Sequence, residues 1–129
     1  MRTVRRRVLL ALLGWALICT AQEGRWEYLG EANVDGAVDH DSIAATAARG
    51  EFRAIQIRVE KGPILFDRVL VHYGNGRTEP ISIRERIPAG GRTRVIDLPG
   101  NERIIRRVEF WYERGNWRIR PTVRLWGLH

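Results

Sequence analysis

Apolar and polar residues alternate one by one along most of the chain beyond residue 22. This is the pattern of β-strands that bury one side and expose the other. The clearest examples are the segments 55–60, 69–73, 81–87 and 117–126. Short groups of turn-forming residues separate such segments, namely Gly74-Asn75-Gly76, Ala89-Gly90-Gly91, Pro99-Gly100-Asn101 and Gly115-Asn116. About eight short strands with regular turns predict an all-β domain, an antiparallel β-sandwich of jelly-roll type, with a barrel as the alternative.

The alternation also predicts which side chains point into the core. Two inward faces follow from it, formed by Ile104, Val108, Phe110 and Tyr112 on one strand and by Trp26 and Tyr28 on the first strand. The segment 42–48 reads as a poorly defined strand or a short helix. In the last strand Pro121 predicts an edge position or a bulge, because proline donates no hydrogen bond to a sheet.

The first 21 residues have the organisation of a secretory signal peptide. Arg5–Arg7 precede an unbroken apolar stretch from Val8 to Cys19, and Thr20-Ala21 follows it. The stretch has 12 residues, whereas a bilayer-spanning helix needs about 20. We therefore expect cleavage after Ala21, one domain over residues 22–129, a location in the periplasm or outside the cell, and no stable membrane insertion of the mature chain.

The leader carries part of the positive charge of the chain. The whole sequence has 22 basic and 15 acidic residues. Arg2 and Arg5–Arg7 belong to the leader, so the mature domain keeps 18 basic against 15 acidic residues. This small excess does not indicate a nucleic-acid partner. The only cysteine, Cys19, also belongs to the leader, so the mature domain depends on its apolar core and not on a disulfide.

Exposed tryptophans beside arginines indicate a binding surface. If Phe110 and Tyr112 point inward, Trp111 points outward, and the Gly115-Asn116 turn would make the last two strands neighbours. The predicted contact face consists of Trp111, Trp126, Arg118, Arg120 and Arg124. Such a face suits an envelope polysaccharide or a protein partner, since indole rings stack on sugars and anchor interfaces. The alternative is that arginine stems or a loop cover the rings.

An acidic segment supports a second hypothesis, a calcium-stabilised domain. Asp35, Asp39 and Asp41 could supply oxygen ligands for Ca²⁺, although the EF-hand spacing is missing. The alternative is a solvated turn whose carboxylates cap backbone amides. Zinc has weaker support, because His40 lacks a second histidine or a cysteine at ligand spacing. No other cofactor is expected.

Catalytic patterns are weak in this sequence. Ser42 and Ser82 lie outside any Gly-x-Ser-x-Gly motif. His72 shares a strand face with Leu70, which is typical of a packed histidine and not of a catalytic base. We therefore expect a non-catalytic domain, and a hydrolase is the least favoured class.

Several segments resemble those of a family of small exported bacterial proteins. They are Leu29-Gly30, Phe52–Val59, Val69–Tyr73, Ile87–Leu98, Arg103–Ile105, Val108–Phe110 and Val123–Gly127. Together they are similar to the YaaI-type family of unknown function and cover nearly all of the chain after the leader. The resemblance implies export and a small β domain, and it implies no activity, cofactor or catalytic residue.

Overall fold

The structure is a computed structural model that describes residues 24–34, 40–45, 50–100, 103–113 and 118–129. These residues form nine strands and no α-helix: β1 (Trp26–Asn33), β2 (His40–Ala44), β3 (Glu51–Phe52), β4 (Ala54–Glu60), β5 (Ile64–Tyr73), β6 (Thr78–Ile87), β7 (Ile96–Asp97), β8 (Arg103–Tyr112) and β9 (Thr122–Leu128). Within these ranges no helix has the length and hydropathy that crossing a bilayer requires. The predicted signal peptide lies outside the described residues.

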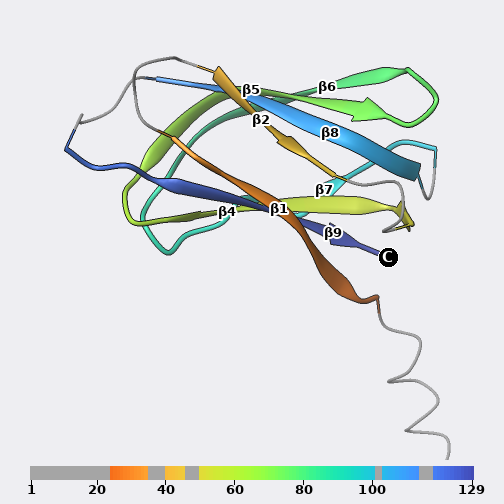
Figure 1. Ribbon diagram of the computed structural model, residues 1–129, viewed down its shortest axis with the longest axis horizontal. Helices are drawn as coiled ribbons and strands as arrows, with labels where there is room; N and C mark the ends of the chain where they lie inside the picture. Colours follow the sequence, from red (N-terminus) through yellow and green to blue (C-terminus); the bar gives the residue numbers. More distant parts are fainter. Residues whose placement is uncertain (1–23, 35–39, 46–49, 101–102, 114–117) are drawn as a thin grey trace, which may run out of the picture.

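The strands form two antiparallel sheets that pack face to face (Figure 1). The four-stranded sheet has the order β1-β9-β4-β7, and the five-stranded sheet has the order β2-β8-β5-β6 with β3 paired to β8. Only β5 and β6 form a long hairpin within one sheet, whereas the chain passes from one sheet to the other between β6 and β7, β7 and β8, and β8 and β9. This order is that of a jelly roll, and the predicted β-sandwich is confirmed.

The apolar sides of the two sheets meet in a single core. The predicted inward positions of the central strands are buried, among them Ile55, Ile57 and Val59 on β4 and Val69 and Val71 on β5. The largest fully buried side chains come from both sheets, namely Tyr73, Phe52, Phe66, Phe110, Ile55, Ile57, Ile83, Ile87, Ile105 and Leu125. Burial of these faces against each other is the main source of stability in a domain of this kind.

A β-bulge interrupts the alternation in β8. Tyr73 pairs with Ile105 and His72 pairs with Arg107, so Arg106 is an extra residue in β8. The extra residue changes the phase of the strand, and Ile105 is buried at 1% exposure while Ile104 is 38% exposed. The prediction that Ile104 points inward was therefore wrong, because a one-residue insertion exchanges the two faces of the strand.

A second bulge lies in β5. Against β8 the register shifts between Phe66 and Arg68 so that Asp67 is an extra residue in β5. Against β6 the register also shifts at this point, but there the additional residue is in β6, between Ser82 and Glu85. Phe66 and Val69 are both buried although three positions separate them. The bulges in β5 and β8 lie in the five-stranded sheet, and each leaves two consecutive residues exposed on its outer face. A further register shift lies in the four-stranded sheet, in β1 between Tyr28 and Gly30.

The last two strands are not neighbours, which corrects a second prediction. β8 belongs to the five-stranded sheet and β9 to the centre of the four-stranded sheet. β9 begins at Thr122, directly after Pro121, because a central strand cannot include a residue that lacks an N–H donor. The nine residues from Glu113 to Pro121 connect the two sheets. The predicted Gly115-Asn116 turn lies outside the described residues.

The first strand also differs from the prediction. Tyr28 pairs with Trp126 and Trp26 pairs with Leu128, and Leu29, the residue that follows Tyr28, is buried in the core. Trp26 and Tyr28 therefore point to the outer side of the four-stranded sheet, and not inward as expected. The segment predicted as a poorly defined strand is a strand as far as Ala44.

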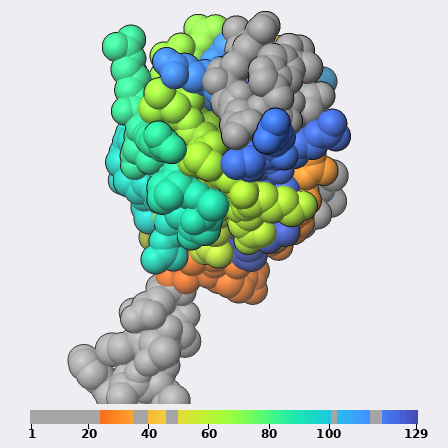
Figure 2. All heavy atoms as spheres, turned by 90° about the vertical axis from the view of Figure 1, so that its left-hand side faces the viewer, coloured from red at the N-terminus to blue at the C-terminus, as the bar shows by residue number. Residues whose placement is uncertain are grey.

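Tight turns hold the ends of the sandwich together. Between β5 and β6 the Gly76 N–H donates to the Tyr73 carbonyl over 3.1 Å, and Gly76 has a φ of 85°, which favours glycine. At the opposite end the Gly90 N–H donates to the Val59 carbonyl over 2.8 Å. Figure 2 shows atoms of the β4–β5 and β6–β7 segments packed against one another at that end.

The bulge in β8 predicts that alanine substitutions at two adjacent isoleucines lower the free energy of unfolding by different amounts. Ile105→Ala should lower the free energy of unfolding by about 2–5 kcal/mol, because it leaves a cavity in the core. Ile104→Ala, the matched control, should cost less than about 1 kcal/mol, because that side chain is substantially exposed. Urea denaturation of both variants measures the difference. A larger loss for Ile104→Ala would contradict the assigned position of the bulge.

Candidate functional site

The bulge in β8 places two arginines side by side on the outer face of the five-stranded sheet. In a regular strand Arg106 and Arg107 would point to opposite faces. Here both are exposed, because Ile105 and Val108 on either side of them are buried. Since bulges redirect side chains in this way, the outer face gains one more positive charge than regular alternation would give it.

Trp111 stands on the same outer face between two cross-strand neighbours. The register pairs it with His40 on β2 and with Arg68 on β5. The His40 ring stacks on the indole at 5.0 Å with an interplanar angle of 20°. The Arg68 Cζ lies 3.8 Å from the indole centroid. Because β8 lies between β2 and β5, the two neighbours approach the indole from opposite sides, and its edge is the part left for a ligand.

Glu109 is the carboxylate at the centre of this face. Its Oε2 accepts a hydrogen bond from His40 Nε2 at 2.9 Å, and its Oε1 accepts one from His72 Nε2 at 2.5 Å. Arg107 Nη2 lies 3.4 Å from Oε1. The glutamate side chain is 14% exposed. Three strands are therefore joined across the outer face by one carboxylate, and His72 is a hydrogen-bonded, packed histidine, as predicted.

The surroundings of Glu109 shift its acidity. Burial by itself would raise the pKa of Glu109, but the hydrogen bonds from His40 and His72 and the charge of Arg107 outweigh it. The pKa of Glu109 consequently lies below its ordinary value of 4.5. The carboxylate is thus held in its charged form, in which it neutralises part of the positive charge around it.

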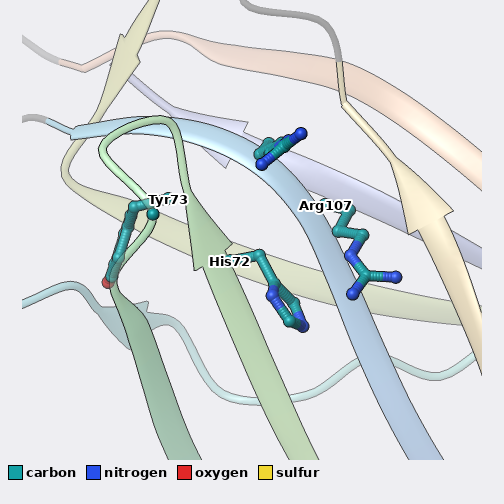
Figure 3. A pocket seen from close by; sticks show the side chains of 5 residues that line it. His72, Tyr73 and Arg107 are labelled. Carbon is teal, nitrogen blue, oxygen red and sulfur yellow. The ribbon is translucent and has the colours of Figure 1, made fainter.

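A cavity of about 380 Å³ opens beside the β8 bulge and is lined by His72, Tyr73, Gly76, Arg106 and Arg107. Figure 3 shows the His72 and Arg107 side chains beside each other and the Tyr73 hydroxyl turned away from both. Tyr73 is buried, and desolvation together with the charge of Glu79 raises the pKa of its phenol against the opposing effect of Arg103. The polar groups that face the opening are consequently basic.

The predicted contact face is not brought together. Trp126 lies on the outer side of the four-stranded sheet, where Arg58 Cζ is 4.4 Å from its ring centroid and Tyr28 contacts it edge-on at 5.5 Å. Trp111 lies on the other sheet. Arg118 and Arg120 are exposed in the segment before β9. The predicted group fails because its two strands belong to different sheets, and both indoles have arginine packed on them, as the alternative stated.

Arg124 is the third predicted arginine and is held by two glutamates. Its Nη1 donates to Glu60 Oε1 at 2.8 Å, and its Nε lies 3.4 Å from Glu31 Oε1. The hydrogen bond from Tyr28 and the charge of Arg124 lower the pKa of Glu31 against a smaller effect of burial. The charges on this part of the four-stranded sheet are therefore paired with each other.

The predicted calcium ligands are only partly described. Asp35 and Asp39 lie outside the described residues. Asp41 is on β2, and its Oδ1 accepts a hydrogen bond from the Ser42 backbone N–H at 2.8 Å. Among the residues that the structure describes, no group of three His, Cys, Asp or Glu side chains could hold a metal ion. Calcium binding therefore remains a prediction.

Sequence reasoning missed Glu109, Arg68, Arg106 and Arg107 as members of a site. His40 was assigned to the acidic segment, whereas its ring contacts residues of β8. One signal was available, since Phe66 with Val69 and Ile105 with Val108 are apolar pairs separated by three positions. Such spacing inside an alternating strand indicates a bulge.

The lowered pKa of Glu109 predicts a pH-dependent contribution to stability. The unfolded chain binds a proton at Glu109 more readily than the folded chain does. The contribution is therefore complete above about pH 5 and is lost as the pH falls through the lowered folded pKa. Glu109→Gln should be less stable than wild type at pH 7, and the two should converge in acid. Urea midpoints between about pH 7 and pH 3 measure this.

The control for this measurement is Glu113→Gln. Glu113 is exposed at the end of β8, and its side chain makes no hydrogen bond or ion pair with any other described residue. The urea midpoint of this variant should change with pH in the same way as that of wild type. If the urea midpoint of Glu109→Gln also changes with pH as that of wild type does, the histidine and arginine contacts do not stabilise the carboxylate.

Comparisons with known proteins give one family and two similar structures. Residues 8–127 match the family described as a domain of unknown function (DUF2541). The structure is similar to that of AlgX from Pseudomonas aeruginosa, with a TM-score of 0.54 and 12% identity over 78% of this chain and 26% of that chain. This chain thus spans about a quarter of AlgX, and at this identity the likeness concerns the fold alone.

A second similar structure is a mutant of CBM29-2, a family 29 carbohydrate-binding module. It has a TM-score of 0.38 and 14% identity over 82% of this chain and 84% of that chain. A search of curated proteins found no match. Because the family match extends over nearly the whole sequence, this chain belongs to the DUF2541 family of domains of unknown function.

Proposed function

We propose that the protein is an exported, non-catalytic binding module that holds an acidic envelope polysaccharide on the outer face of its five-stranded sheet. The observation that carries the proposal is the group of cationic side chains on that face. The Arg68 guanidinium lies over the Trp111 ring. On the same strand as Trp111, the bulge in β8 places Arg106 and Arg107 next to each other on this face. Two acidic residues of this face oppose that charge, namely Glu109, whose carboxylate lies between the two histidines, and the exposed Asp67 next to Arg68.

The four-stranded sheet carries a similar aromatic pair but a different charge pattern. Arg58 lies on Trp126 much as Arg68 lies on Trp111. Arg124 beside it is already paired with Glu31 and Glu60. An acidic ligand would have to compete with these two glutamates, so the five-stranded sheet is the better candidate for recognising an anion.

Arginine stacked on tryptophan suits recognition of acidic sugars. The ring holds the guanidinium plane in position, while the N–H groups at the edge of that plane stay available for a carboxylate. A side chain that is already ordered loses less conformational entropy when a ligand binds. Arg68 and the exposed edge of Trp111 would then contact consecutive units of a polymer that lies across β5 and β8.

The arrangement of hydroxyl and imidazole groups supports a non-catalytic role. Ser42 pairs with Glu109 across β2 and β8 on the face that holds His40. Both histidines direct Nε2 to the carboxylate, and within the described part of the chain no hydrogen bond joins the Ser42 hydroxyl to either of them. An activated serine needs such a bond to its base.

Binding of acidic polysaccharide should depend on Arg68. We expect wild type to bind polygalacturonate and not neutral dextran, and Arg68→Ala to weaken that binding about tenfold, which is the usual effect of losing a charge-assisted hydrogen bond. Binding should also weaken as salt is added, because exposed charges are screened. Isothermal titration calorimetry or affinity electrophoresis in each polymer measures these effects.

Arg58→Ala is the matched control for this experiment, since it removes the equivalent arginine from the tryptophan on the opposite face. It should leave polysaccharide binding unchanged. A loss of binding in Arg58→Ala alone would place the site on the four-stranded sheet. Equal binding of dextran and polygalacturonate, or none of either, would refute recognition of an acidic polymer and leave a protein partner as the remaining candidate.

Export predicts a defined mature N-terminus. When the full chain is expressed in a Gram-negative host, the periplasmic form should begin at Gln22, because signal peptidase cleaves after a small residue such as Ala21. The resemblance to YaaI-type proteins supports the same expectation. Intact-mass measurement of the periplasmic fraction tests it, and an uncleaved chain confined to the cytoplasm would contradict it.

A further inference from the structure

We infer that the cavity beside the β8 bulge is a binding site for an oxyanion, the carboxylate or phosphate group of a larger ligand. Its lining consists of His72, Tyr73, Gly76, Arg106 and Arg107. The inference adds a specific subsite to the proposed function. It depends on that function only in taking an acidic polysaccharide as the molecule that carries the group.

The bulge gives the cavity two guanidinium groups from consecutive residues. Arg106 and Arg107 both lie on the outer side of β8, opposite His72 of β5. Each guanidinium carries five N–H donors in a planar fork, and this fork matches the oxygen pairs of carboxylates and phosphates. Two forks on one side of a cavity can hold one oxyanion from two directions.

The donors of these arginines are largely free. The nearest carboxylate, Glu109, uses both of its oxygens to accept hydrogen bonds from the two histidines. Arg107 approaches it only to 3.4 Å and is 46% exposed, whereas a charge-assisted hydrogen bond is usually about 2.7–2.9 Å long. The Arg106 side chain makes no ion pair or hydrogen bond within the residues that the structure describes.

Glu79, an acidic residue described near this end of the sheet, points away from the opening. Glu79 pairs with Val71, whose side chain is buried, so Glu79 points to the inner side of the sheet at its edge. Tyr73 is 2% exposed, and its ring lies under Arg103 with a Cζ-to-centroid distance of 4.8 Å. The positive charge that an incoming anion meets at the opening therefore comes from Arg106 and Arg107, which line the cavity.

The β5–β6 turn leaves the cavity accessible. A Cβ atom added at Gly76 would meet no atom within 4 Å, so the rim formed by the turn is open at this point. Figure 3 shows His72 and Arg107 next to each other on neighbouring strands, and both line the cavity together with Gly76. A charged group on a polymer that crosses β5 and β8 could therefore enter without a change in the backbone.

The test is a titration of the purified protein with inorganic phosphate, and separately with acetate, followed by ¹H–¹⁵N NMR at constant ionic strength. We expect saturable shifts of the Gly76 amide and of the Arg106 and Arg107 side-chain N–H signals. Arg106→Ala and Arg107→Ala should each weaken the binding at least fivefold. Sodium chloride at the same ionic strength should produce no such shifts. The two anions tell whether phosphate or carboxylate is preferred.

Two arginines outside the cavity serve as controls. Arg94→Ala removes the same charge from an exposed residue next to the four-stranded sheet and should leave the titration unchanged. Arg68→Ala should weaken polygalacturonate binding but not phosphate binding. If phosphate binds wild type and Arg106→Ala equally, or if chloride reproduces the shifts, the inference is wrong even where polysaccharide binding persists. Phosphate binding without polysaccharide binding would refute the proposed function alone.

Discussion

Each strand of the sandwich has to keep its apolar side chains on the core side along its whole length. In β8 this requirement is met only because the strand carries one extra residue. Without Arg106, either Ile105 or the group formed by Val108, Phe110 and Tyr112 would point to solvent, since a one-residue shift reverses every later side chain. The hydrogen-bonded ladder loses one regular position at the bulge, and the burial of three core side chains offsets that loss. The same extra residue places two arginines together outside.

The outer face that results carries more positive charge than its own contacts neutralise. Glu109 joins β2, β8 and β5 through the two histidines, and its surroundings keep it ionised. One carboxylate is enough to hold the histidines in place but not to engage the arginines fully. On the opposite sheet two glutamates hold the single guanidinium of Arg124. The two faces thus differ in the arginine pair that the β8 bulge adds to one and in the pairing of Arg124 on the other, and both differences favour the five-stranded sheet in the proposed recognition of an anion.

The sequence predicted what depends on local alternation and missed what depends on pairing between distant strands. The inward residues of β4 and β5, the turn at Gly76 and the sandwich itself follow from period-two patterns and glycine positions. Ile104 was wrongly predicted to point inward, because a bulge exchanges the inner and outer positions of a strand and the residue types alone do not reveal it. Trp26 and Tyr28 were misplaced because only the pairing with β9 decides which side of a half-buried strand is covered. His40 and His72 were never connected, because the glutamate between them is far from both in the chain.

The separation of Trp111 and Trp126 follows from the jelly-roll order, in which successive strands pass from one sheet to the other. Packed sheets lie about 10 Å apart, and the two indoles stand on their outer sides, so one flat ligand surface cannot cover both. Each indole instead carries an arginine from a neighbouring strand. Because this pair recurs on both faces, it orders an arginine side chain on each sheet but does not by itself distinguish the two faces. Selectivity must then come from a feature that the five-stranded sheet adds, namely the adjacent pair Arg106 and Arg107 that the β8 bulge places on its outer face.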